Sequence, residues 1–187
     1  MRNNPHTEFS MKKPVLGLMA VGILIVFLTS FINGSGIPDG SRPSGEGQAK
    51  SEALAEVPAL MAKLQENPKD MDALMELAES FSRAQDWDKA ALFWGKIVDL
   101  KPEDVNALNH RGAALMQAGR YHDAIADFEK ILSANPKTYH ALYHIGIIYK
   151  YGLKENEKAK EYLQRALDAN PQDQNLLKAI QQELATL

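Results

Sequence analysis

Residues 105–138 read VNALNHRGAALMQAGRYHDAIADFEKILSANPKT, and this stretch decides the fold. Its apolar side chains recur every three or four residues in two segments, a spacing that predicts two amphipathic helices joined by a short turn. The stretch ends just beyond a proline, and prolines recur along the chain at intervals of 34, 34 and 35 residues, at Pro68, Pro102, Pro136 and Pro171. A constant period of this size is typical of a repeat protein.

The same apolar and small residues return between successive prolines. They are Leu74, Leu77, Ala78, Phe81, Ala90 and Trp94, then Leu108, Gly112, Leu115, Ala124 and Phe128, then Leu142, Ile145, Gly146, Tyr149, Ala159 and Leu163. Small residues let paired helices approach closely, so Gly112 and Gly146 are predicted to be packing residues. No single hairpin could bury its apolar face alone, and the repeats must therefore stack into one continuous core.

These residues resemble the tetratricopeptide repeat, whose pattern W-x2-L-G-x2-Y, then A-x3-F, then P is matched in three copies across Met71 to Asp173. The resemblance implies an all-α fold, a right-handed superhelical stack of three helix-turn-helix hairpins with a C-terminal capping helix. The expected parts are a lead-in helix at 51–70, repeats at 71–104, 105–138 and 139–173, and the capping helix at 174–187.

Some residues depart from the repeat pattern. Leucine replaces the tryptophan in all three copies, and Arg111 replaces the leucine before Gly112. One extra residue stands in the third repeat around Tyr151 to Asn156, where we expect it only to lengthen a turn. In the lead-in helix, Pro58 is expected to restart or kink the chain.

The N-terminal region contains a candidate transmembrane segment. Val15 to Ile32 is free of charged residues and long enough to span a bilayer core. The basic residues Arg2, Lys12 and Lys13 precede it, which predicts a cytoplasmic N-terminus at 1–13 and a transmembrane helix at 14–32. The Gly-, Ser- and Pro-rich stretch 33–50 is expected to be a flexible linker. The alternative is a cleaved signal peptide, for which Gly34-Ser35-Gly36 is a weak cleavage site.

Composition excludes several classes of function. The chain has 187 residues and no cysteine, which excludes disulfides, thiolate zinc sites, cysteine nucleophiles and covalent c-type haem attachment. Beyond residue 50 there are 16 basic and 21 acidic residues, a balance that argues against a nucleic-acid surface.

In the proteins that this sequence resembles, the first helix of each repeat lines a concave groove. The groove residues that follow from the resemblance are Asn106, Asn109, His110, Met116, His140, Tyr143, His144, Ile147 and Tyr151. Acidic residues near Asp72 occupy the other end of the groove. Such a mixed lining is typical of a peptide-binding surface. The Lys and Asn carboxylate clamp of chaperone-binding relatives is missing, which argues against docking of an acidic chaperone C-terminus.

No motif indicates catalysis, and we expect neither an enzyme nor a bound cofactor. His140 and His144 are four residues apart on one predicted helix face, so a metal site is conceivable. No carboxylate has an evident place beside them, and we therefore interpret these histidines as groove lining. A metal-dependent activity remains the least favoured hypothesis.

The order of parts is similar to that of the membrane-anchored tetratricopeptide proteins of bacterial cytochrome c maturation. This resemblance implies a single-pass inner-membrane protein whose repeat domain lies in the periplasm. Its partner would be apocytochrome c or a haem-ligation subunit. The alternative is a general cell-envelope assembly scaffold for a secretion, pilus or cell-wall complex.

Overall fold

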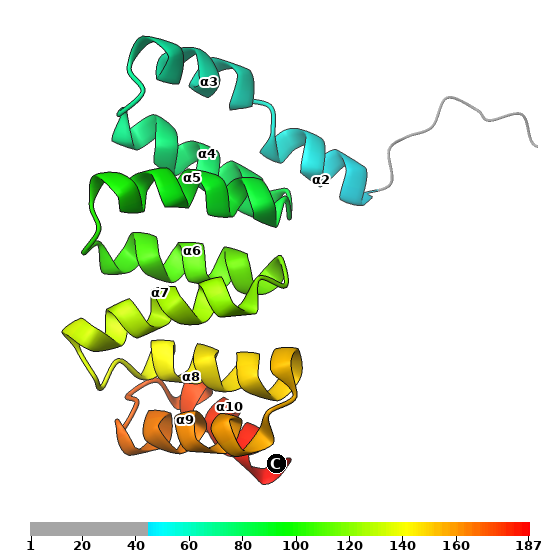
Figure 1. The fold of residues 1–187 in the computed structure, drawn as a ribbon. Coiled ribbons are helices and arrows are strands. Elements are labelled where there is room, and N and C mark those ends of the chain that lie inside the picture. The colour runs from blue at the N-terminus through cyan, green and yellow to red at the C-terminus, as the bar shows by residue number, and fades with distance from the viewer. Residues whose placement is uncertain (1–44) are drawn as a thin grey trace, which may run out of the picture. The chain divides into compact units, whose positions relative to one another are not determined.

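The computed structural model describes residues 45–187, and every regular element in that part of the chain is helical (Figure 1). In order, the elements are α2 (Gly45–Ala53), α3 (Val57–Glu66), α4 (Met71–Arg83), α5 (Trp87–Leu100), α6 (Val105–Gln117), α7 (Tyr121–Ala134), α8 (Tyr139–Ile147), the π-helical turn η1 (Ile148–Leu153), α9 (Asn156–Asp168) and α10 (Gln174–Ala185). The all-α prediction is thereby confirmed for the described residues.

The predicted membrane segment lies outside the part of the chain that the structure describes. Among residues 45–187, no helix combines the length and the apolar character that a membrane crossing requires. The cytoplasmic segment expected at 1–13 and the anchor expected at 14–32 lie outside the described residues, as does most of the linker expected at 33–50.

Three helical hairpins follow one another along the chain: α4 with α5, α6 with α7, and α8 and η1 with α9. Figure 1 shows them stacked in chain order, and α5 packs on α6 just as α7 packs on α8. The buried side chains form one cluster that includes Leu74, Leu77, Phe128, Leu142, Ile145 and Leu163. Each hairpin therefore completes its core only with its neighbours, as the repeat logic requires.

The turns between hairpins also repeat. Asp70 and Asp104 precede α4 and α6, and each carboxylate accepts backbone hydrogen bonds from the first turn of its helix. In the case of Asp104, Oδ1 accepts from the N–H groups of Asn106 and Ala107, both at 3.0 Å. Such caps satisfy donors that the helix itself leaves unpaired, while the proline two residues before each cap ends the previous helical pattern.

Two glycines set the spacing of the paired helices. A Cβ atom at Gly112 would lie 2.9 Å from Cζ of Phe128, and one at Gly146 would lie 2.7 Å from Cγ of Leu163. Both distances are well inside van der Waals contact, so any larger residue would force the helices of the hairpin apart. The predicted packing role of Gly112 and Gly146 is confirmed.

The lead-in segment is not the single helix that was predicted over 51–70, but two helices. α2 already begins at Gly45, the chain then turns at residues 54–56, and α3 runs from Val57 to Glu66 with Pro58 in its first turn. Proline has no N–H to donate and fits the first turn without loss of a helical hydrogen bond. It therefore restarts the helix rather than kinking it.

The prediction that the extra residue of the third repeat lengthens a turn is wrong. The residue is taken up in η1, where α8 continues as a wider helical turn. The π-helix occurs in proteins mostly as a single widened turn of this kind. η1 ends at Leu153, and its C-cap Lys154 has a φ of 60° that reverses the chain into α9.

The last helix, α10, caps the third hairpin. The Lys150 side chain in η1 is only 8% exposed, and its Nζ donates hydrogen bonds to the carbonyl oxygen and to Oε2 of Glu183, both at 2.8 Å. Nζ also donates to Oγ1 of Thr186. The π-helical turn thus holds the C-terminal end of α10 through one buried ammonium group whose three donors are all used.

Candidate peptide-binding groove

The first helices of the hairpins, α4, α6 and α8, line two adjoining cavities. Subsite 1, of about 420 Å³, lies between α4 and α6 with α5 at its base. Subsite 2, of about 250 Å³, lies between α6 and α8 with α7 at its base. Asn106 lines both cavities, and the two subsites together are called the groove below.

The two subsites are built from equivalent positions. Six residues of subsite 1 have counterparts 34 residues later in subsite 2: Met71, Met75, Ile97, Asp104, Asn106 and His110 correspond to Val105, Asn109, Ile131, Thr138, His140 and His144. The groove is therefore one cavity made twice by the repeat. Its chemistry changes between the copies, because methionine and aspartate give way to valine, asparagine and threonine.

Each of two equivalent histidines packs on an aromatic ring of the preceding hairpin. His110 stacks on Trp94 with ring centroids 4.6 Å apart and planes 13° apart. His144 stacks on Phe128 at 5.0 Å and 16°. One face of each imidazole is thus taken up by packing, and Trp94 is a core residue that also forms part of the base of subsite 1.

The surroundings of His144 perturb its pKa. Burial, followed by the nearby charge of His140, lowers the pKa of His144 from 6.5 to about 4. His144 is therefore mostly neutral between pH 5 and pH 8, the range in which an unperturbed histidine changes its charge. Any change of affinity in that range must come from another group.

Five of the nine residues predicted to line the groove do so: Asn106, Asn109, His110, His140 and His144. The other four lie elsewhere. Met116 and Tyr143 are half-buried against the hydrophobic core, and Ile147 and Tyr151 line neither subsite. Tyr143 and His144 both bury part of their rings within the stack.

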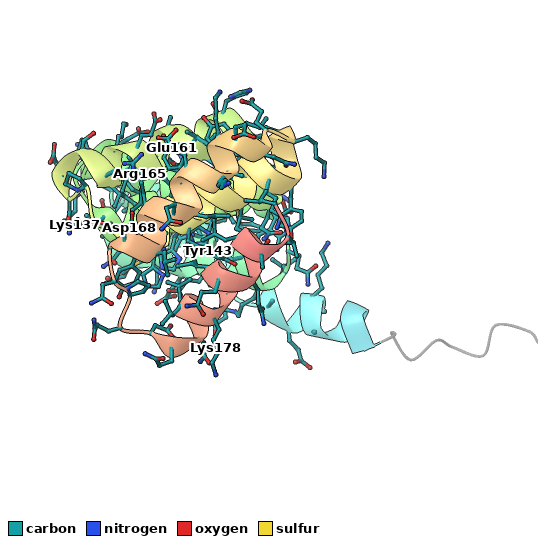
Figure 2. The ribbon with its side chains drawn as sticks, turned by 90° about the horizontal axis from the view of Figure 1, so that it is seen from below. Lys137, Tyr143, Glu161, Arg165, Asp168 and Lys178 are labelled. Atoms are coloured by element: carbon teal, nitrogen blue, oxygen red, sulfur yellow. The ribbon has the colours of Figure 1, made fainter. Side chains whose placement is uncertain are left out.

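Tyr151 is held by the capping helix. Its hydroxyl donates a 2.7 Å hydrogen bond to Oε2 of Glu183 in α10. Tyr143 lies beside α10 in Figure 2, and its pKa is raised by burial and then by the charge of Glu183. Tyr143 and Tyr151 thus each interact with α10, although Tyr151 remains 52% exposed.

Several lining residues were not predicted. Met71 extends the wall of subsite 1, Ile97 and Ile131 form parts of the two bases, and Asp104 and Thr138 come from the inter-hairpin turns. The 34-residue period could not supply them, because none of their counterparts was among the predicted residues. Ile97 and Ile131 belong to the second helices of their hairpins and Asp104 and Thr138 to turns, whereas the resemblance points to the first helices.

A larger cleft, of about 690 Å³, lies between α5 and α7 on another face of α5. Its rim mixes acidic and basic side chains, so it favours no ligand of one charge. At its base Arg111 donates a 2.6 Å hydrogen bond from Nε to Oδ2 of Asp127 and a second from its guanidinium to Oδ1. Arg111 is the departure from the repeat pattern noted above, and the structure explains it as half of a buried ion pair.

Within residues 45–187, no group of three or more His, Asp or Glu side chains is arranged to hold a metal ion. The lining of the groove consists of apolar walls with amide, imidazole and carboxylate groups at the rim. Groups of these kinds can hydrogen-bond to a peptide backbone or to polar side chains, and apolar walls of this kind can accept side chains.

This geometry defines a helical repeat protein. Residues 72–103 and residues 115–184 match family models of the tetratricopeptide repeat, and the chain therefore carries tetratricopeptide repeats over those residues. No curated protein matches the chain.

Solved structures share the fold. The crystal structure of MamA is 16% identical, with a TM-score of 0.58, and the match covers 78% of this chain and 93% of that chain. The TPR2B domain of yeast Sti1, in complex with pHsp70, is 22% identical with a TM-score of 0.55, covering 61% and 92%. The first TPR of Spaghetti (RPAP3), bound to the HSP90 peptide SRMEEVD, is 23% identical with a TM-score of 0.50, covering 60% and 90%.

Proposed function

We propose that the chain is a non-enzymatic protein-interaction module that holds a peptide segment of its partner in the groove. The observation that carries this proposal is the pair of equivalent subsites, which offers an extended ligand two pockets in a row. The apolar bases would take side chains, and Asn106, Asn109 and His140 at the rim would bond to the peptide backbone. The Sti1 and Spaghetti structures, which contain bound peptides or partners, support this use of the fold.

We also propose that residues 14–32 anchor the protein in the bacterial inner membrane as a single pass, with the repeats in the periplasm. The support is the uncharged run from Val15 to Ile32 and the basic residues ahead of it. A mature chain that begins near Ile37, or that leaves the membrane fraction in a carbonate wash, would contradict the anchor.

For the pathway, we propose c-type cytochrome biogenesis, with apocytochrome c or a haem-ligation subunit as the partner. The support is the order of anchor, linker, lead-in helix and three repeats. A general envelope scaffold makes the opposite prediction, since secretion, pilus or cell-wall proteins would then be recovered with the chain in place of cytochrome-assembly proteins.

The decisive experiment blocks the groove without touching the core. Asn106 is exposed and lines both subsites, so the side chain of Asn106→Trp should fill them. The backbone N–H of residue 106 can still donate its hydrogen bond to Oδ1 of Asp104, which caps α6. The matched control is Lys96→Trp, an exposed position in the cleft between α5 and α7. We expect partners captured by the full chain from envelope extract to be lost from Asn106→Trp and kept by Lys96→Trp. Retention by both variants, with unchanged circular dichroism, would contradict binding in the groove.

A further inference from the structure

The acidic residues on the groove-forming helices are confined to one of them. α4 carries Asp72, Glu76 and Glu79 against a single basic residue, Arg83. α6 and α8 carry no acidic residue at all. Of these residues Glu79 lines subsite 1, whereas no carboxylate lines subsite 2, so a ligand meets different charge in the two subsites.

Subsite 1 combines this charge with long apolar walls. Met71 and Met75 line one side, and Trp94 and Ile97 lie at the base. Met75 is 39% exposed and therefore accessible to a ligand in this cavity. Methionine side chains adapt to the shape of a bound chain. The walls fit an unbranched aliphatic stem, such as that of lysine, arginine or methionine.

The rim of subsite 1 supplies two carboxylates. Glu79 is largely exposed, and its 3.7 Å contact with Arg83 is a surface pair that contributes little. Both capping bonds of Asp104 use Oδ1, which leaves Oδ2 to accept a hydrogen bond from a ligand. The basic side chain in the lining, Lys101, stands in the same turn as Asp104 and offsets only part of this charge.

Subsite 2 is smaller and is built from equivalent positions without the carboxylates. Thr138 replaces Asp104, Asn109 replaces Met75, and no acidic or lysine side chain lines the cavity. His144 at its wall is neutral at physiological pH for the reasons given above. An uncharged side chain is the better occupant here, because a buried charge would have no counter-charge.

On the basis of the proposed peptide-binding function, we infer that the partner peptide places a lysine or arginine side chain in subsite 1 and an uncharged side chain in subsite 2. The aliphatic stem would lie along Met71 and Met75, and the cationic head would meet Glu79 and Asp104. Stems of this kind bury readily while their charged heads stay at a polar rim. The ligand is thus basic at one position, in contrast to the acidic peptide held by the Spaghetti domain.

The test is selection from a random peptide library displayed on phage, panned against the full chain in uncharged detergent. We expect the selected peptides to share one lysine or arginine at a fixed position. A synthetic peptide from the selection, labelled with fluorescein, should lose about tenfold in affinity when that residue becomes glutamine. The affinity should fall with added salt, since the interaction is partly exposed.

Charge-removing variants locate the contact. Glu79→Gln and Asp104→Asn should each weaken the lysine peptide but not its glutamine version, and asparagine still caps α6. The matched control is Glu157→Gln, which removes an equal charge from an exposed site on α9 and should change nothing.

The possible failures are distinct. If the selected peptides no longer bind to Asn106→Trp, the groove function stands. The inference is nevertheless contradicted if those peptides lack a basic residue, or if they bind to all the charge variants with equal affinity. Peptides indifferent to Asn106→Trp, or no selected peptide at all, contradict the proposed function together with the inference.

Discussion

Arg111 and Asp127 form a bidentate ion pair that joins α6 to α7 inside the second hairpin. Asp127 is 2% exposed, and the hydrogen bonds that Arg111 donates to its carboxylate raise the pKa of Arg111 above its ordinary value. One repeat earlier the same two positions hold Leu77 and Phe93, both buried. The second repeat has therefore exchanged an apolar contact for a charged one at the same place.

This exchange predicts strong coupling between the two residues. Arg111→Leu alone leaves the buried carboxylate of Asp127 without a partner and should lower the free energy of unfolding by about 3 to 5 kcal/mol. The double variant Arg111→Leu with Asp127→Phe restores the pair of the first repeat and should return to within about 1 kcal/mol of the original. Denaturant unfolding, monitored by circular dichroism, measures the free energy of unfolding of the single and the double variant. Additive losses would show that the two positions do not act as a pair.

The glycine contacts predict the cost of overpacking. Gly112→Leu and Gly146→Leu should each lower the free energy of unfolding by about 1 to 3 kcal/mol, because the new side chain meets Phe128 or Leu163. Gly95→Ala is the matched control, since its new Cβ would lie 3.7 Å from the nearest atom, Cδ of Arg111. That change should be neutral or stabilising in a helix interior. Equal thermal midpoints for all variants would refute the close approach of these helices.

The buried imidazole of His144 predicts a pH dependence of stability. Its pKa of about 4 in the folded state lies below the value of 6.5 in the unfolded chain, so the unfolded state binds more protons between these two values. Stability should therefore fall as the pH drops through that window, by about 2 kcal/mol from this residue between pH 7 and pH 5.

The control for this dependence is His144→Phe, which keeps a ring stacked on Phe128 but carries no titratable group. The free energy of unfolding of the original protein, relative to that of His144→Phe, should fall by about 2 kcal/mol as the pH drops from 7 to 5. A constant difference between them over this range would show that His144 is accessible to protons in the folded state.

The contacts of Lys150 predict that α10 depends on one side chain. Burial works to raise the pKa of Glu183, but hydrogen bonds from Lys150 and Tyr151 outweigh it and leave that pKa lowered. Lys150→Met removes the ammonium group and should lower the stability of the C-terminal cap by about 2 kcal/mol. Amide hydrogen exchange in α10 should then be faster, whereas exposed Lys154→Met should leave it unchanged. Full protection of α10 in Lys150→Met would be incompatible with this role.

The sequence period predicted the hairpins and the close contacts of Gly112 and Gly146, because both depend on packing that every repeat reproduces. It did not predict η1, since one inserted residue leaves the same trace in a turn and in a widened helix. Arg111 and Asp127 resemble surface residues until they are aligned with Leu77 and Phe93. The loss of Tyr151 from the groove depends on Glu183, a residue 32 positions away that no local pattern connects to it.

α6 supplies one wall to each subsite, and this has an evolutionary consequence. A substitution in α4 alters only the first pocket and one in α8 only the second, so the outer helices are free to diverge separately toward a new partner. Within α6, Asn106 is constrained from both sides, because it lines both subsites. Duplication of one 34-residue unit would add a further pocket in the same register. Recognition in this architecture therefore lengthens by whole units, and not by the enlargement of an existing pocket.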